Sequence, residues 1–322
     1  MVAVILVNYN GFYDTIKCVD SILESDYTFF KVIIVDNDSN DNSVEEISKS
    51  FDLVKNDGEE NALTGLTSVY TNSNKQIILL TSYRNSGFAG ANNLGIKYTE
   101  RYYPEFEFYW LLNNDTIIEC NSLRQIVNRA KESASDIGII GTNLLYLDNP
   151  NIIQALGGKY NPLSATCRHI GAHMNKCECY EIIKAVRADY VVGASMLVKK
   201  TFVNSVGYME ESYFLYFEEL DWILRGKQYG WGFFIDYDIN IYHKEGGSTK
   251  ATHRLISEVA DKCQLRNRIL FTKKFYPSCL FLVLCSTFLT IVKRFMSGHI
   301  NRSKVLLNVF CEEVKKICIR AK

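Results

Sequence analysis

The chain has 322 residues, of which 47% are hydrophobic and 22% are charged, so it can bury a substantial core. Lys plus Arg and Asp plus Glu number 36 each, and a net charge of zero argues against a nucleic-acid-binding protein, whose surface is usually basic. Ten cysteines are too sparse for a disulfide scaffold in a chain of this length, so we expect reduced thiols and a cytoplasmic protein.

The first half of the chain alternates continuous apolar runs with segments of helical periodicity. Apolar strands separated by helices predict an α/β fold, with a mostly parallel sheet covered by helices on both faces. Ser43 is the expected cap of the second helix. The predicted strands are 2–10, 31–41, 75–85 and 106–116, and the predicted helices are 12–25, 43–51 and 89–103.

The second half is less regular. Residues 186–207 suggest a strand, a turn, a second strand and a short helix, and residues 211–243 suggest a helix followed by a strand. After Gly246 and Gly247 the chain becomes helical and basic. Within it, residues 275–292 form an apolar stretch of about eighteen residues, near the lower limit for a membrane span. We expect a packing or interfacial helix in contact with the inner membrane face, with a true span as the alternative.

Three predicted strands end in polar residues of the same kind, at Asn8–Asn10, Asp36–Asp38 and Asn113–Asp115. The carboxyl ends of parallel strands meet at one edge of a sheet, where open α/β proteins bind ligands. Asp36 could bind a ribose or a base there, and Asp115 with an Asn oxygen could hold Mg²⁺ or Mn²⁺. Turn and cap residues are the structural alternative at each position.

A glycine-containing loop opens the third predicted helix. Gly87, Gly90 and Gly95 do not have the spacing of a dinucleotide-binding fingerprint and do not follow the first strand, so we reject nicotinamide binding. Small residues at the start of a helix still allow the backbone to approach a phosphate or a sugar.

Glu218, Glu219 and Asp221 form a group of carboxylates among aromatic residues, with Arg225 four residues after Asp221. A solvated helix start would explain them. Carboxylates in an apolar setting also tend to hold their protons more tightly, which suits a general base. His243, at the end of a predicted strand, is either structural or a metal ligand.

Five further candidate metal ligands lie close together in the middle of the chain. Their spacing matches no ordinary zinc motif, so we expect a loop with reduced thiols and no stoichiometric zinc. These residues are Cys167, His169, His173, Cys177 and Cys179.

Seven segments, in this order, resemble glycosyltransferase family 2 over residues 2–275, and in particular its bacterial rhamnosyltransferase-like branch. They are "VAVILVNYNG", "IIVDNDSNDNS", "RNSGFAGANNLGI", "WLLNNDTII", "VVGASMLVKK", "GYMEESYFLYFEELDW" and "YHKEGGS". The resemblance implies an inverting, metal-dependent enzyme of GT-A fold. Its catalytic domain would be 1–248, with a nucleotide-sugar half (1–120) and an acceptor half (121–248), followed by a helical region (249–322).

The resemblance also implies roles for particular residues. Asp115 and His243 would hold Mg²⁺ or Mn²⁺, although Asn113 stands where the family's DxD motif has its first carboxylate. Glu219 would be the catalytic base, and Glu218 and Asp221 would orient the acceptor. The donor, a nucleotide-sugar such as dTDP-rhamnose or a UDP-sugar, would lie against Val7, Asn8, Asn10, Asp36, Asn37, Arg84, Asn85, Gly87, Asn113 and Asn114.

The implied reaction moves the sugar to a glycan or lipid-linked glycan during cell-surface polysaccharide synthesis. Two other functions fit parts of the pattern. An inactive nucleotide- or carbohydrate-binding module would not need Asp115, Glu219 and His243 together. A sugar-phosphate nucleotidyltransferase would need a glycine-rich loop with a basic residue after the first strand, which "VNYNGFYD" does not provide.

Overall fold

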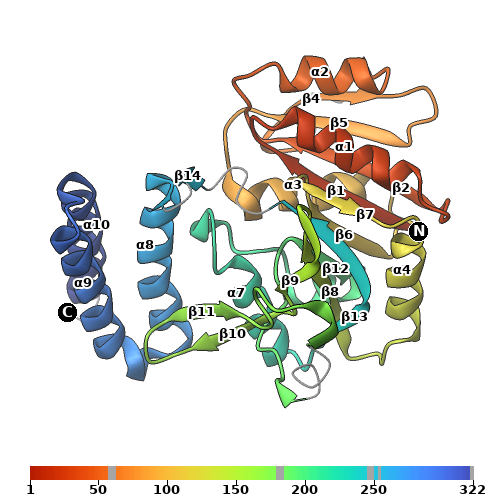
Figure 1. The fold of residues 1–322 in the computed structure, drawn as a ribbon. Coiled ribbons are helices and arrows are strands. Elements are labelled where there is room, and N and C mark those ends of the chain that lie inside the picture. The colour runs from red at the N-terminus through yellow and green to blue at the C-terminus, as the bar shows by residue number, and fades with distance from the viewer. Residues whose placement is uncertain (57–62, 179–184, 245–249, 253–254, 320–322) are drawn as a thin grey trace.

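The computed structural model describes residues 1–56, 63–178, 185–244, 250–252 and 255–319. An eleven-stranded sheet has the order β3-β4-β5-β2-β1-β6-β12-β8-β13-β7, and β9 pairs with β8 at its side (Figure 1). Its strands are β1 (Val2–Asn8), β2 (Phe30–Asp36), β3 (Val54–Lys55), β4 (Leu66–Thr71), β5 (Ile77–Ser82), β6 (Phe108–Asn113), β7 (Thr116–Ile118), β8 (Ile137–Tyr146), β9 (Asn149–Ala155), β12 (Ser195–Lys199) and β13 (Gly232–His243).

The core of this sheet is parallel, as predicted. Strands β5, β2, β1 and β6 pair in parallel. Beyond β6 the sheet is mixed, because β12 runs antiparallel between β6 and β8 while β13 pairs in parallel with β8. The predicted α/β fold is therefore confirmed, and the antiparallel β12 separates its two halves.

Helices pack on both faces of the sheet because β1 places apolar side chains on each face. Val2 and Val4 face one core and Ala3 and Ile5 the other, as the two-residue period of a strand requires. The first core receives α1, α2 and α4, and the second receives α3, α6, α7 and α8. These helices are α1 (Phe12–Leu23), α2 (Ser43–Ser50), α3 (Gly87–Tyr102), α4 (Ser122–Glu132), α6 (Lys200–Val206), α7 (Glu218–Gln228) and α8 (Glu258–Phe275).

Local predictions differ from the structure at several places, among them α2, α3, β4 and α7, which begins at Glu218 and not near residue 211. Asn42 precedes α2, and the Asp41 carboxylate accepts a hydrogen bond from the Ser43 backbone N–H, so Ser43 is the first helical residue and not its cap. Helix α3 begins at Gly87, two residues before the predicted start. Strand β4 was missed because "LTSVYT" mixes hydroxyl and apolar residues, and only pairing with β3 and β5 reveals it.

The C-terminal region is helical, with α8 followed by α9 (Leu280–Met296) and α10 (Ile300–Ile319) (Figure 1). Helix α8 contributes Phe271 to the core beneath the sheet. On its other side, Leu265 and Ile269 pack with Ile291 of α9 and Leu306 of α10 in a separate small core. Helix α8 thus joins the terminal helices to the α/β body.

Candidate functional site

The polar ends of three strands meet at one edge of the sheet. In the strand register, Asn8 of β1 lies opposite Asp36 of β2, and Val7 of β1 lies opposite Asn113 of β6. The three segments are distant in sequence but adjacent here, because β1 is hydrogen-bonded to both neighbours.

Asn8 and Asp36 form a closed network. The Asn8 amide donates to the Asp36 carboxylate at 2.7 Å and accepts from the Thr15 hydroxyl at 2.8 Å. Ser39 donates its hydroxyl to the same carboxylate at 2.6 Å. Asn8 is fully buried and Asp36 is 2% exposed. Asn8 was predicted to line a nucleotide site. In the structure its side chain holds the Asp36 carboxylate in place.

Asn37 and Asn85 fasten the start of α3. Asn37 is buried, donates to the Asn85 side chain at 3.0 Å and accepts from the Ser86 N–H at 2.9 Å. Asn85 in turn accepts from the Gly87 N–H at 3.0 Å. The amide groups predicted to contact a donor thus shape the loop on which a donor could lie.

Other residues that were predicted to contact the sugar donor lie at or near the surface. Asn10 and Arg84 are exposed, and Val7 and Asn114 are half-buried. The Asn114 amide donates to the Thr15 hydroxyl at 2.8 Å, which ties the end of β6 to α1.

Asp115 and His243 come together although 128 positions separate them in the sequence. Asp115 Oδ1 lies 3.0 Å from His243 Nε2, and each side chain is 13% exposed. Gln154 Oε1 lies 2.6 Å from His243 Nδ1. An amide oxygen can only accept, so this contact keeps a proton on Nδ1 and leaves the Nε2 lone pair facing Asp115 and the Asn113 amide, whose Nδ2 lies 3.2 Å away.

This pair fits a divalent cation. A carboxylate oxygen and an imidazole lone pair at 3.0 Å need a proton or a cation between them. Adjacent ligands of an octahedral Mg²⁺, each at about 2.1 Å, would lie about 3 Å apart. Among the described residues no group of three His, Cys, Asp or Glu side chains converges, so the remaining ligands would be water or substrate oxygens.

Glu218 and Glu219 open α7 in an apolar setting. One carboxylate oxygen of each, Oε2, is buried and has no hydrogen-bond partner in the described part of the chain. Burial, and then the neighbouring Glu219, hold the pKa of Glu218 well above its ordinary 4.5. Burial raises the pKa of Glu219 to about 7, against backbone N–H groups of Glu219 and Gly193 that favour the anion.

The third carboxylate has another environment. Asp221 is fully buried and bonds to the Arg225 guanidinium at 2.6 Å, the Lys274 ammonium at 2.6 Å and the Tyr213 hydroxyl at 3.0 Å. Both oxygens are engaged inside the protein. Asp221 was predicted to orient an acceptor. Its contacts suit a structural role better, because they fasten α7 to α8.

The segment before α7 has a strained backbone. Phe214, Tyr216 and Phe217 all have positive φ angles, of 65°, 70° and 78°, which are costly for residues with side chains. The buried Asn267 amide of α8 donates to the carbonyls of residues 213, 215 and 216 at 2.8, 2.8 and 3.0 Å.

Gly87 holds the same segment from the other side. The Phe88 N–H donates to the Phe214 carbonyl at 2.8 Å, and a Cβ at Gly87 would lie 2.2 Å from that oxygen. Only glycine permits this approach. The start of α3 and the middle of α8 together fix the backbone that leads to Glu218 and Glu219.

Gly193 and Ala194 connect the carboxylates with the strand ends. The Gly193 backbone N–H lies beside the Glu219 carboxylate and favours its anionic form. The carbonyl of the next residue, Ala194, accepts a hydrogen bond from the Asn113 N–H at 2.9 Å. Glu219 thus contacts Gly193, and the end of β6 is hydrogen-bonded to the next residue, Ala194. The carboxylates of α7 therefore border the candidate site formed by the strand ends.

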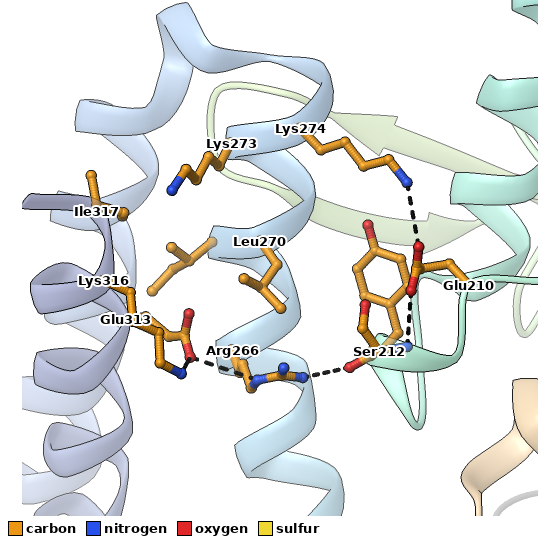
Figure 2. Close-up of a pocket in the computed structure, with 11 residues that line it drawn as sticks. Glu210, Ser212, Arg266, Leu270, Lys273, Lys274, Glu313, Lys316 and Ile317 are labelled. Carbon is orange, nitrogen blue, oxygen red and sulfur yellow. Dashed lines mark hydrogen bonds and ion pairs between the residues drawn. The ribbon is translucent and has the colours of Figure 1, made fainter. Parts of the chain in front are cut away.

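A pocket of about 470 Å³ lies elsewhere, between α8, α10 and the segment from Glu210 to Tyr213 (Figure 2). Arg266 donates to the Ser212 carbonyl at 2.6 Å and pairs with Glu313 of α10 at 3.6 Å. Lys316 also pairs with Glu313, at 2.7 Å. Most of the charged groups here neutralise each other, and they fasten α10 to the body.

The thiol-rich region forms a hairpin of β10 (Gly158–Asn161) and β11 (Thr166–His169), followed by a turn. His173 stacks on Tyr146. Cys179, like Gly246 and Gly247, lies outside the described residues. The expected absence of zinc stays a prediction.

Several site residues escaped the sequence reasoning. Gln154 could have been noticed as a lone polar residue in the apolar run "IIQAL", and Ser39 as a hydroxyl beside the acidic strand end. Asn267 gave no signal, because it stands in a helix with many polar residues.

Residues 3–155 match the family model described as glycosyl transferase family 2. The match covers 153 of the 322 residues, so the N-terminal part of the chain is similar to this family. The matched region includes Asp36, Asp115 and Gln154 but ends before Glu218, Glu219 and His243. The assignment of those three residues therefore depends on the structure and not on the family match.

A curated glycosyltransferase is similar to part of the chain. The chain is 26% identical over 161 residues to the low-salt glycan biosynthesis hexosyltransferase Agl10 of Haloferax volcanii, a match that covers 48% of each chain. It thus spans about half the length of this curated relative.

Solved structures show that the chain has the GT-A fold. A mannosyltransferase from Pyrobaculum calidifontis, in complex with GDP-Man and Mn²⁺, has a TM-score of 0.55 and 13% identity over 95% of this chain and 78% of its own. TarS 1–349 of S. aureus, in complex with UDP-GlcNAc, has a TM-score of 0.55 and 14% identity over 97% and 81%. GalNAc-T7 with UDP, GalNAc and Mn²⁺ has a TM-score of 0.61 and 13% identity over 87% and 49%.

Proposed function

We propose that this chain is an inverting hexosyltransferase that moves a sugar from a nucleotide-diphosphate donor to a hydroxyl group of a glycan or lipid-linked glycan. The observation that carries the proposal is the junction at Gly193 and Ala194. It connects the Glu219 carboxylate, one oxygen of which is buried without a hydrogen-bond partner among the described residues, with the strand end that carries Asp115. A base for the acceptor and a cation site for the donor would thus border one edge of the sheet.

Glu219 is the better candidate for the base. Its pKa of about 7 leaves it about half anionic at pH 7 and largely anionic at slightly alkaline pH, whereas burial and the neighbouring Glu219 hold the pKa of Glu218 well above its ordinary value. A general base is most effective when its pKa lies near the working pH. Glu219 would accept the proton of the acceptor hydroxyl as that oxygen attacks the anomeric carbon and the bond to the diphosphate breaks.

Asp115 and His243 would hold Mg²⁺ or Mn²⁺ on the donor diphosphate. A cation there would stabilise the negative charge that gathers on the leaving nucleotide. Gln154 keeps His243 in the tautomer that a metal ligand needs. Two similar solved structures, one in complex with GDP-Man and Mn²⁺ and one with UDP, GalNAc and Mn²⁺, support a donor and a cation of these classes.

The finer assignments are proposals of the same kind. By resemblance the first donor to test is dTDP-rhamnose and the next are UDP-hexoses, with an acceptor from cell-surface polysaccharide synthesis. Eight described cysteines are free thiols, which supports a cytoplasmic protein.

A donor screen tests the function. Thermal shift and donor hydrolysis would be measured for the full chain with each nucleotide-sugar, with and without Mn²⁺. We expect one donor to stabilise the protein only when Mn²⁺ is present. Asp115→Ala should abolish both this stabilisation and transfer, whereas Asp136→Ala, at an exposed position beside β8, should change neither.

Two results would overturn parts of the proposal. Full transfer activity in excess EDTA, or in Asp115→Ala, would remove the metal assignment. Failure of every nucleotide-sugar to bind or to be hydrolysed would instead favour an inactive binding module.

A further inference from the structure

Exposed apolar side chains gather at one end of the molecule. Of nineteen large hydrophobic residues that are exposed in the described chain, ten lie in α9, α10 and their connection. In Figure 1 these helices lie at the end of the molecule away from the main sheet. The ten are Phe281, Leu282, Phe288, Leu289, Val292, Phe295, Met296, Ile300, Leu307 and Ile319.

Helix α9 is apolar on its outer side as well as its inner side. Val283, Thr287 and Ile291 point inward and are buried, while Phe281 and Met296 are 75% and 79% exposed. A helix at a water-exposed surface normally carries polar residues on its outer face. Among the described residues, the segment Pro277–Met296 is the one helical stretch long and apolar enough to cross a membrane.

The charge of this region favours a membrane as the partner of α9. Residues 258–319 contain eleven Lys and Arg but four Asp and Glu, although the whole chain is neutral. Two copies of such a basic surface would repel each other, whereas a bilayer with anionic headgroups would attract it. Apolar area beside basic residues is the combination that binds the surface of an anionic membrane.

We propose that the outer face of α9 docks into the interface of an anionic lipid bilayer, with the helix lying along the surface. The residues that enter the lipid are Phe281, Leu282, Phe288, Leu289, Val292, Phe295 and Met296, here called the α9 face. This proposal does not depend on the reaction that the chain catalyses.

The inner side of α9 excludes a transmembrane orientation. Arg268 of α8 donates to the Ser286 hydroxyl at 2.8 Å, and Arg294 of α9 pairs with the nearly buried Asp261 of α8 at 2.8 Å. A spanning α9 would draw these charged partners into hydrocarbon or break their contacts, and either is costly.

Docking also orients the candidate active site. Helix α8 packs against α9 and holds the segment before α7 through Asn267. A membrane-bound α9 would therefore keep the carboxylates of α7 at a constant distance from the lipid surface. This arrangement suits an acceptor that is itself attached to a lipid.

Vesicle sedimentation tests the docking. The full chain would be mixed with vesicles of phosphatidylcholine alone or with 30% phosphatidylglycerol. We expect binding to the anionic vesicles and release by alkaline carbonate. The double variant Phe281→Ser with Leu289→Ser should bind at least tenfold more weakly.

The matched control is Phe29→Ser with Val54→Ser. Phe29 is 63% exposed, and Val54 of β3 is 70% exposed. Both lie at the main sheet and outside α9, so this variant should bind vesicles like the wild type. Thermal unfolding checks that both variants remain folded, as expected for exposed positions.

Four results would overturn the proposal. They are no binding to anionic vesicles, equal loss of binding in the control variant, retention in the membrane after carbonate extraction, and a stable dimer at micromolar concentration that dissociates on substitution of Phe281 and Leu289. The third result would indicate a span, and the fourth a second copy of the chain as the occupant of the α9 face.

Discussion

Glu219→Gln should separate catalysis from stability in a pH-dependent way. Glutamine keeps the shape of the side chain but cannot ionise or accept the acceptor proton. Transfer should fall by about 10²–10⁴-fold, the usual contribution of a general base. Binding of the donor with Mn²⁺ should remain close to that of the wild type, because donor binding does not require the base.

The same substitution should stabilise the protein at alkaline pH. The pKa of Glu219 is about 7 in the folded chain and near 4.5 when unfolded, so the unfolded chain loses its proton first. Stability therefore falls as pH rises from 4.5 to 7, and above pH 7 the deficit reaches about 3 kcal/mol. Glutamine has no such deficit, so its advantage should be near zero at pH 4.5 and full at pH 8.

Urea unfolding of wild type and Glu219→Gln at pH 4.5, 6, 7 and 8 would measure this difference. A gain of about 3 kcal/mol at pH 8 corresponds to a rise of roughly 4 °C in Tm for a chain of this size. The activity of the wild type should rise with pH through about 7, as Glu219 ionises.

Glu218→Gln is the matched control, because it replaces the neighbouring buried carboxyl, which holds its proton more tightly. We expect it to retain most transfer activity. An inactive Glu218→Gln beside an active Glu219→Gln would move the base by one residue. If the stability difference between wild type and Glu219→Gln does not change between pH 4.5 and 8, the claim that burial raises the pKa of Glu219 is refuted.

Other residues make independent predictions. Gln154→Leu should weaken Mn²⁺ binding about 10–100-fold in electron paramagnetic resonance titrations, because His243 loses the partner that orients it; unchanged affinity would contradict this role. Asn267→Ala should lower the free energy of unfolding by about 2–3 kcal/mol and reduce kcat more than donor affinity, whereas the exposed Asn308→Ala should do neither. Asp221→Ala should destabilise the fold by about 3 kcal/mol or more, since Arg225 and Lys274 lose their shared partner; a change confined to acceptor KM would restore its predicted role. Elemental analysis should find no stoichiometric zinc, and about one zinc per chain that is lost in Cys177→Ser would prove this expectation wrong.

The sequence by itself determined the parallel core and the edge of the sheet where the site lies. Val2–Asn8 and Phe30–Asp36 are apolar runs that stop at polar residues, and burial on both faces of a parallel strand produces that pattern. The α7 carboxylates were also recognisable, because charged groups among aromatic residues are unusual.

Only the tertiary structure decided what each polar side chain does. Asn8 and Asp221 looked like ligand-binding residues but have their partners inside the protein. Gln154 and Asn267 looked ordinary but hold His243 and the strained segment before α7. A sequence pattern reports periodicity along the chain, whereas the role of a polar group depends on which partner its hydrogen bonds reach. For these residues that partner lies up to 89 positions away, and folding alone brings the two together.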